Sequence, residues 1–492
     1  MSDDLRFLWG GIWVPIQEAN KHFFIIGATG SGKTLSLRLL MQEVLPLVGG
    51  RRGDGTPLDH RALVYDAKQD MLAYLYGMGI APARIKILNP FDARCAAWNI
   101  AADVTAPATA LQIAAILIPE EKNSSQPFFA NAARHLLYGV MLAFILASPG
   151  RWTFRDLCLA MRSEEGMRDI LSRSEHTEHL VAMYLNEGDT LNSVKATIAA
   201  KMMPYEVVAA LWSRSTETVS LRDFLDPEKE RLLLVLGNAE ESREAVDAIN
   251  RVLFQRLSEL VVGQPESEER RTWIFLDEVR EAGRLDGLRS LLLRGRSKGV
   301  CVVLGFQDID GLKEVYGEYQ AQEMVGQCGY KAILRLESPT TAEWASLHFG
   351  TVERVVKRAS ESSTFGQGMS RQTGESEQLE KTEIVLPIEL LKIPPVNPRE
   401  RRLAGFYLTP VKHYPHTFRF GEGDDDPEPG SPLRYFPLLA PARGAAFVAR
   451  GEADQYLDPW TTDDLDRLNL RSPPERERKK QDVSLDDLGS VQ

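Results

Sequence analysis

A glycine-rich segment near the amino terminus contains the residue types that bind phosphate. Residues 23–34 read FFIIGATGSGKT, an apolar run that leads into the spacing G-x-x-x-x-G-K-T. In such a loop, backbone N–H groups converge on phosphate oxygens at a helix N-terminus, the lysine adds a positive charge, and the threonine hydroxyl binds Mg²⁺. We therefore expect a nucleoside triphosphate site that uses ATP and Mg²⁺. The expected contacts are Gly27, Thr29, Gly30, Ser31, Gly32, Lys33 and Thr34.

Two adjacent carboxylates follow a second apolar run. The segment WIFLDE brings Asp277 and Glu278 to the carboxyl end of a predicted buried strand. There the aspartate can hold Mg²⁺, and the glutamate can orient or deprotonate the attacking water. Acidic residues are also common at helix N-termini, so the pair gains its meaning from the phosphate loop. A glutamate directly after the aspartate favours an ATPase motor over a kinase or a GTPase switch.

Two more groups of polar residues lie close to these motifs in the sequence. The apolar run 300–306 is followed by Gln307, where an amide can touch the γ-phosphate or the water; a plain polar strand end is the alternative. Just before this run, Arg294, Arg296 and Lys298 cluster on a predicted turn. Such clusters are usually solvated surface, but in a ring ATPase they can present an arginine to the neighbouring subunit's nucleotide.

The elements that must position these residues are short apolar runs separated by helix-length segments. This alternation predicts an α/β fold with a mostly parallel central sheet. Between residues 102 and 222 the strand-like runs give way to helical periodicity, which predicts an inserted all-helical domain. The apolar stretch 136–147 is too short to span a membrane, and we expect a buried helix there. The predicted strands are 22–28, 61–67, 231–238, 272–278, 300–308 and 330–338.

Composition and charge set the remaining boundaries of the 492-residue chain. Its net charge is −11, and residues 421–492 hold 16 acidic against 9 basic side chains, which leaves −4 for residues 1–420. A nearly neutral body argues against a broadly basic nucleic-acid surface but permits a local basic pore. Four scattered cysteines suggest neither disulfides nor zinc and are compatible with a reducing cytoplasm. The predicted parts are a motor domain in two pieces (1–101 and 223–420), an inserted helical domain (102–222) and an acidic tail (421–492).

Two polar stretches are predicted to lack a compact structure. Residues 359–380 have almost no large apolar side chains, which predicts a mobile loop within the second motor piece. The tail is acidic and contains proline, which predicts that it is mostly disordered. Its short apolar islands suggest docking onto a partner protein, or packing back on the motor through Trp460 or through Tyr435 and Phe436.

Several segments together resemble the TraD/TraG-type coupling ATPases of conjugation and type IV secretion, from about residue 9 to 415. They are GGIWVPIQEANKHF, ILNPFDARCAAWNI, FFANAARHLL, the stretch from FLDEVREAGRL to LGFQD, and AEWASLHFGTVE. The resemblance implies a RecA-like P-loop NTPase that assembles as a homo-hexamer, moves DNA without sequence preference, and is related to the FtsK and HerA motors. It also assigns Lys33, Thr34, Asp277, Glu278 and Gln307 to the nucleotide site. Arg296 is the best match for the arginine that acts on a neighbouring subunit.

By this resemblance, the chain is an ATP-driven DNA translocase. Family members typically begin with membrane-spanning helices, which the sequence does not predict here. We therefore expect a cytoplasmic protein, which relaxosome or secretion-channel proteins could bring to the inner membrane. Beyond FFANAARHLL, the helical domain shares few specific residues with the family. Two alternatives stay open: an ATP-dependent docking module that recruits protein cargo, and a HerA-type ATPase of defence or genome maintenance.

Overall fold

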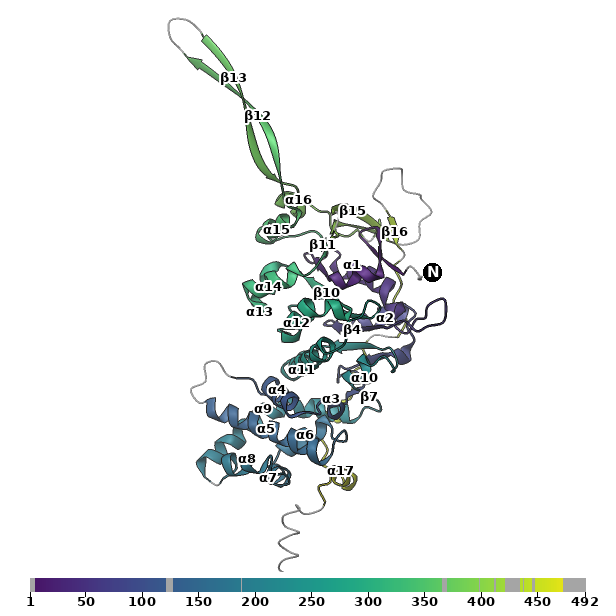
Figure 1. The fold of residues 1–492 in the computed structure, drawn as a ribbon, viewed down its shortest axis with the longest axis vertical. Helices are drawn as coiled ribbons and strands as arrows, with labels where there is room; N and C mark the ends of the chain where they lie inside the picture. The colour runs from purple at the N-terminus through teal and green to yellow at the C-terminus, as the bar shows by residue number, and fades with distance from the viewer. Residues whose placement is uncertain are drawn as a thin grey trace, which may run out of the picture.

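A ten-stranded sheet forms the centre of the protein, in the order β16-β15-β14-β11-β3-β10-β9-β4-β8-β5 (Figure 1). The computed structural model describes residues 5–120, 127–186, 188–364, 370–397, 399–410, 413–420, 434–436, 438–444 and 447–471. The neighbours from β11 to β5 are parallel, and β14 and β15 continue the sheet antiparallel beyond β11. All six predicted strands belong to this sheet, which confirms the predicted α/β class. The sheet strands are β3 (Phe23–Ile26), β4 (His60–Asp66), β5 (Ile85–Ile87), β8 (Leu233–Gly237), β9 (Arg271–Leu276), β10 (Val300–Phe306), β11 (Tyr330–Ile333), β14 (Arg402–Leu408), β15 (His413–Phe420) and β16 (Arg434–Phe436).

The parallel strands are buried on both faces, which explains their continuous apolar sequences. Alternate residues of one strand enter two different cores: in β3, Phe24 and Ile26 pack with one cluster and Phe23 and Ile25 with the other. Helices α11–α14 lie on one side of the sheet, and α1 and α2 lie on the other (Figure 1). These helices are α1 (Lys33–Val44), α2 (Met71–Gly77), α11 (Arg243–Val262), α12 (Asp286–Arg294), α13 (Ile309–Tyr316) and α14 (Glu318–Gly326).

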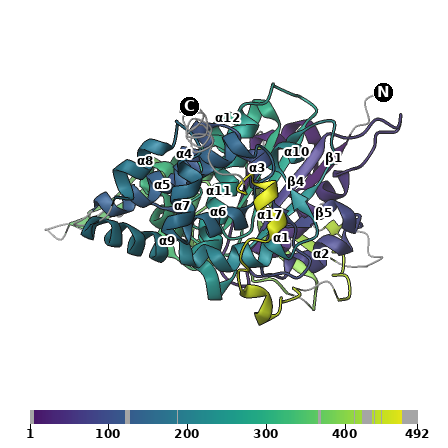
Figure 2. The same ribbon diagram turned by 90° about the horizontal axis from the view of Figure 1, so that it is seen from below.

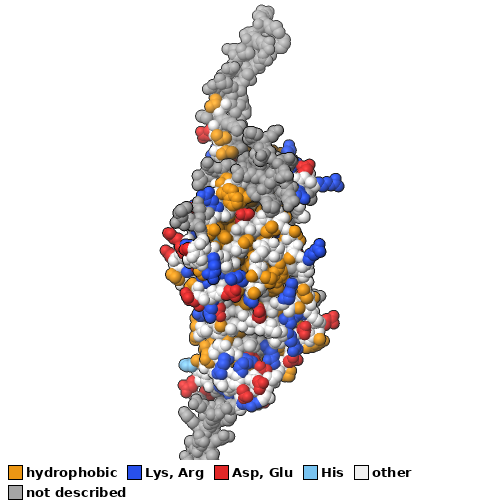
Figure 3. Space-filling view, turned by 90° about the vertical axis from the view of Figure 1, so that its right-hand side faces the viewer, with side chains coloured by type: hydrophobic (Ala, Val, Ile, Leu, Met, Phe, Trp, Pro, Cys, Tyr) orange, Lys and Arg blue, Asp and Glu red, His pale blue; other side chains and the backbone are white. Residues whose placement is uncertain are grey.

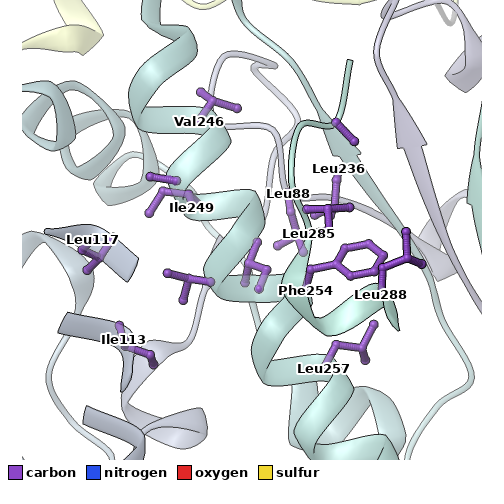
Figure 4. Packing of buried hydrophobic residues seen from close by; sticks show 14 of the residues in the cluster. Leu88, Ile113, Leu117, Leu236, Val246, Ile249, Phe254, Leu257, Leu285 and Leu288 are labelled. Atoms are coloured by element: carbon purple, nitrogen blue, oxygen red, sulfur yellow. The ribbon is translucent and has the colours of Figure 1, made fainter. Parts of the chain in front are cut away.

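A helical domain packs beneath the sheet through α11. Figure 4 shows that α11 lies between Leu88 and Leu236 of the motor and Ile113 and Leu117 of the helical domain. The two parts therefore share one continuous apolar core, which fixes how they meet. The chain enters and leaves this domain next to a short parallel strand pair, β6 (Ala97–Trp98) and β7 (Thr218–Val219). The helices between them are α3 (Ile100–Asp103), α4 (Pro107–Leu117), α5 (Pro127–Ala147), α6 (Phe154–Met161), α7 (Glu164–Leu171), α8 (Glu178–Tyr184) and α9 (Asp189–Ser213), and α10 (Leu221–Leu225) follows β7.

Helix α5 contains the apolar stretch that the sequence places in a buried helix. By length and composition alone it could cross a membrane, but 67% of its most apolar window is buried within the protein. Its buried side chains contact the other helices of the domain, so its hydrophobicity is used in the core.

The expected mobile loop at 359–380 is largely a two-stranded hairpin. Strands β12 (Thr351–Thr364) and β13 (Ser370–Glu383) pair antiparallel and project away from the motor (Figure 1), while residues 365–369 lie outside the described residues. The register places Glu353 opposite Lys381. Cross-strand pairs of opposite charge favour a hairpin. The expectation of a loop is wrong for these strands, because a hairpin that projects from the body does not need the apolar alternation of a half-buried strand.

The prediction of a mostly disordered tail is also wrong for part of residues 421–492. Residues 434–436 form β16, and the chain from 451 to 471 contains the short helix η7 (Glu452–Gln455) and α17 (Thr462–Arg467). Figure 2 shows α17 lying against the rest of the protein. Residues 421–433, 437, 445–446 and 472–492 lie outside the described residues. The remaining elements are β1 (Arg6–Trp9), β2 (Ile12–Pro15), α15 (Pro339–Ser346) and α16 (Pro387–Leu391).

Candidate nucleotide site

The phosphate-binding loop joins the end of β3 to the start of α1. Gly30 and Gly32 have φ angles of 73° and 99°, in the left-handed region that favours glycine. A Cβ atom on Gly32 would lie 2.3 Å from Leu403 Cδ1, so a side chain is also sterically excluded there. Glycine is thus required for the tight turn that opens α1 directly at Lys33.

The acidic pair lies beside the loop. Asp277 and Glu278 follow β9 and are each 7% exposed. The Thr34 hydroxyl donates to Asp277 Oδ2 at 3.0 Å, and the Lys33 ammonium forms an ion pair with Glu278 Oε2. The two halves of the predicted site, 243 residues apart in sequence, therefore meet through side-chain contacts.

Gln307 reaches the same carboxylate from a third strand. Strand β10 lies between β3 and β9, so its carboxyl end opens between the loop and the acidic pair. Burial raises the pKa of Glu278 above its ordinary value, and this rise is opposed by the Lys33 ammonium and by a hydrogen bond from Gln307. The environment thus moves Glu278 towards the proton affinity that a general base requires.

Arg296 lies at the other edge of the sheet. It begins the short helix η5 (Arg296–Lys298) immediately before β10, whereas Gln307 immediately follows β10. Seven strand residues span about 23 Å, so Arg296 is too far away to act on the site of its own chain. It lies beside a polar groove of about 900 Å³ that Arg294 and Lys298 also line.

The residues at the loop have the chemistry that ATP and Mg²⁺ require. Ser31 Oγ, which lies in the loop, is buried and has no hydrogen-bond partner among the described residues. A Cβ on Gly30 would meet no atom within 4 Å, so the loop is open on that side. Thr34 and Asp277 together present hydroxyl and carboxylate oxygens, the ligands that Mg²⁺ prefers. The site therefore fits both groups.

Sequence reasoning missed the residues that support the loop from behind. Val396 N donates to Gly30 O at 3.3 Å, and Leu403 packs on Gly32. The Tyr407 hydroxyl, buried within the protein, lies 3.1 Å from Ser36 Oγ of α1. These residues come from β14 and the segment before it, about 370 residues after the loop, and carry no local motif that could have revealed them.

Comparison with known proteins agrees with this geometry. Residues 6–413 match the family model described as the type IV secretion-system coupling protein DNA-binding domain. The chain belongs to this coupling-protein family. Among curated relatives, coupling protein TraD of Escherichia coli K12 is 24% identical over 372 residues, which is 74% of this chain and 48% of TraD. The conjugal transfer protein TraG of Rhizobium radiobacter is 26% identical over 229 residues, 45% of this chain and 34% of TraG.

Solved structures of the coupling protein TrwB share the fold. Unbound TrwB lacking its first 70 residues aligns with a TM-score of 0.64 at 21% identity, covering 91% of this chain and 92% of TrwB. TrwB in complex with ADP and Mg²⁺ aligns with a TM-score of 0.62, covering 92% of this chain and 94% of TrwB. The RecA-like motor with an added helical domain is thus the fold of this coupling protein. By contrast, the chain spans only half or less of the curated relatives' length.

Proposed function

We propose that this coupling protein is an ATP-driven DNA translocase that couples ATP hydrolysis to DNA transfer in conjugation or type IV secretion. The observation that carries the proposal is the meeting of Lys33 with Glu278 and of Thr34 with Asp277 at the carboxyl edge of the sheet. The printed names of the relatives, which describe coupling and conjugal transfer, support the same role. As domain boundaries we propose 1–101 and 223–420 for the motor and 102–222 for the helical domain.

Each side chain has a distinct role in this proposal. Lys33 and the loop would hold the phosphates of ATP, and Thr34 and Asp277 would hold Mg²⁺, which supplies charge neutralisation at the phosphates. Glu278 takes the proton from the attacking water, for which its raised pKa suits it. Gln307, which bonds to Glu278, orients that carboxylate and the water beside it.

We further propose a homo-hexameric ring in which Arg296 acts on the neighbour's nucleotide. Its position at the amino edge of the sheet leaves no role in its own site, whereas head-to-tail packing of subunits brings amino and carboxyl edges together. Subunits carrying Arg296→Ala mixed with subunits carrying Lys33→Ala should regain part of the activity that each lacks alone. A fully active monomer at every concentration would disprove the ring.

The DNA contacts are proposed to be independent of sequence and sensitive to salt. On the face drawn in Figure 3, cationic and acidic side chains are interspersed, which fits local phosphate contacts better than a broad basic surface. DNA affinity should fall as the salt concentration rises, and an affinity unchanged by salt would contradict this. We propose a cytoplasmic location, with relaxosome or secretion-channel proteins as the partners that bring the protein to the inner membrane.

The decisive experiment is ATP hydrolysis with and without DNA. We expect Mg²⁺-dependent hydrolysis that DNA accelerates. Lys33→Ala should lose nucleotide binding, whereas Glu278→Gln should bind ATP and hydrolyse it about 10²-fold to 10⁴-fold more slowly. Glu281→Gln is the matched control, because Glu281 is close in sequence but pairs with Arg243. Hydrolysis that DNA leaves unchanged would favour the docking-module alternative, and full activity of Glu278→Gln would exclude it as the base.

A further inference from the structure

The C-terminal strap, residues 447–471, connects the motor to the helical domain. It lies beyond residue 413, where the match to the family model ends. In Figure 1, its helix α17 lies beside α6 and α7, at the end of the helical domain away from the sheet. The contacts of the strap reach both the motor and the helical domain.

The first part of the strap is held by the motor and the root of the helical insertion. Ala93 N donates to Val448 O at 2.8 Å, and Arg450 N donates to Phe91 O at 3.2 Å. The Arg450 guanidinium then donates to Ser215 Oγ, just after α9, at 3.2 Å. This segment is thus fixed by backbone bonds before it reaches the helical domain.

The second part of the strap completes the environment of a buried carboxylate. Asp156 of α6 has 0% exposure. Two strap side chains bind it: Arg467 donates to both of its oxygens at 2.8 and 3.0 Å, and Trp460 Nε1 donates at 2.9 Å. A buried carboxylate without a cationic partner is strongly unfavourable. Arg467 therefore supplies the cationic partner of this carboxylate, which also accepts a hydrogen bond from Thr153 N at the start of α6.

The helical domain also binds the backbone of the strap. Arg155 Nη2 donates to Pro459 O at 2.6 Å, and Arg173 donates to Asn469 O at 2.9 Å and to Leu470 O at 3.0 Å. Leu468 between them is fully buried. Side-chain donors that bind carbonyl groups, combined with a half-buried Trp and a fully buried Leu, are the pattern of a segment bound in a groove.

Charge complementarity supports this interpretation. The groove contributes Arg155 and Arg214, and the strap contributes carboxylates that pair with them. Arg214 pairs with Asp458 at 2.8 Å, and Arg155 pairs with Asp464 at 3.0 Å. In the second pair the Arg155 side chain is 13% exposed and the Asp464 side chain is 17% exposed, so this contact is shielded from solvent.

We propose that the groove between α6, α7 and the carboxyl end of α9 is a peptide-binding groove for an acidic segment anchored by Trp and Leu. In this chain the strap is its occupant, and by filling it the strap ties the helical domain to the motor. The inference does not depend on ATP hydrolysis or DNA transfer.

The test uses the full-length protein and a labelled peptide of residues 456–471. In the wild type the strap fills the groove, so the peptide should not bind. In the double variant Trp460→Ala/Arg467→Ala the strap is weakened, so the peptide should bind, and hydrogen exchange of the strap should become at least tenfold faster. Adding Arg155→Ala to this variant should reduce peptide affinity at least tenfold. Arg471→Ala is the matched control, because Arg471 forms an ion pair with Asp466, which also belongs to the strap.

Every result decides the proposal. The proposal is supported if the peptide binds the double variant and not the wild type. This binding must be lost when Arg155→Ala is added, and also when the peptide carries the same two alanines. Equal binding to wild type and double variant, or no binding to a double variant whose α11 keeps its exchange protection, overturns it. If the double variant fails to fold, Arg467→Lys replaces it, and unchanged strap exchange in that variant likewise overturns the proposal.

Discussion

Replacing Lys33 by alanine should destabilise the protein as well as disable nucleotide binding. The Lys33 and Glu278 side chains form an ion pair and are only 9% and 10% exposed. Without the ammonium, Glu278 keeps the burial that raises its pKa and loses the largest interaction that opposes this rise. The charged form of Glu278 then becomes a cost to the folded state.

This cost has an upper limit that depends on pH, because a buried carboxyl group can avoid its charge by taking up a proton. Protonating a glutamate of ordinary pKa 4.5 costs about 3.4 kcal/mol at pH 7 and about 2 kcal/mol at pH 6, at about 1.36 kcal/mol per unit. Folding raises this pKa, so the group supports stability at low pH, and the support is lost as pH rises. Lys33→Ala should therefore destabilise by up to about 3.4 kcal/mol at pH 7 and by less at pH 6.

The assay is urea unfolding of nucleotide-free protein between pH 6 and 8, followed by far-UV circular dichroism, for Lys33→Ala, Glu278→Gln and the double variant. In the Glu278→Gln background the carboxylate that pairs with Lys33 is absent, so Lys33→Ala should cost less and its cost should depend less on pH. Lys86→Ala is the control, because its partner Glu217 is 61% exposed, and it should cost less than about 1 kcal/mol. An equal cost of Lys33→Ala in both backgrounds, or a cost independent of pH in the wild-type background, would refute the reasoning.

Three further predictions concern His22, Gly32 and Tyr407. Burial lowers the pKa of His22 from 6.5 to about 4. The stability that the neutral His22 contributes is therefore complete above pH 6.5 and is lost as the pH falls towards 4. Urea titrations should show that the wild type, relative to His22→Gln, loses up to about 3.4 kcal/mol of unfolding free energy across this window. Gly32→Ala should abolish ATP binding and lower the melting temperature more than Gly55→Ala, because both glycines have positive φ but only Gly32 has a close neighbour. Equal shifts would contradict the steric argument. Tyr407→Phe should cost about 1 kcal/mol by removing its contact with Ser36, and unfolding free energies unchanged by this variant would count against that contact.

The sequence alone determined the elements whose cause is local. Glycines, Lys33 and Thr34 at fixed spacing after an apolar run predict a strand, a turn and a helix, because the turn needs glycine and the run needs burial. The same holds for the strand that ends just before Asp277. A helical insertion was visible because its periodicity persists over a long stretch.

Only the tertiary structure decided which of these elements meet. Strand order places β10 between β3 and β9, and so brings Gln307 to Glu278, but no local pattern encodes the neighbours of a strand. The hairpin of β12 and β13 was hidden because strands that project from the body need no apolar alternation. The sequence suggested Trp460 as an anchor on the motor. In the structure Trp460 and Arg467 instead bind the buried Asp156 of the helical domain, which lies about 300 residues earlier in the chain.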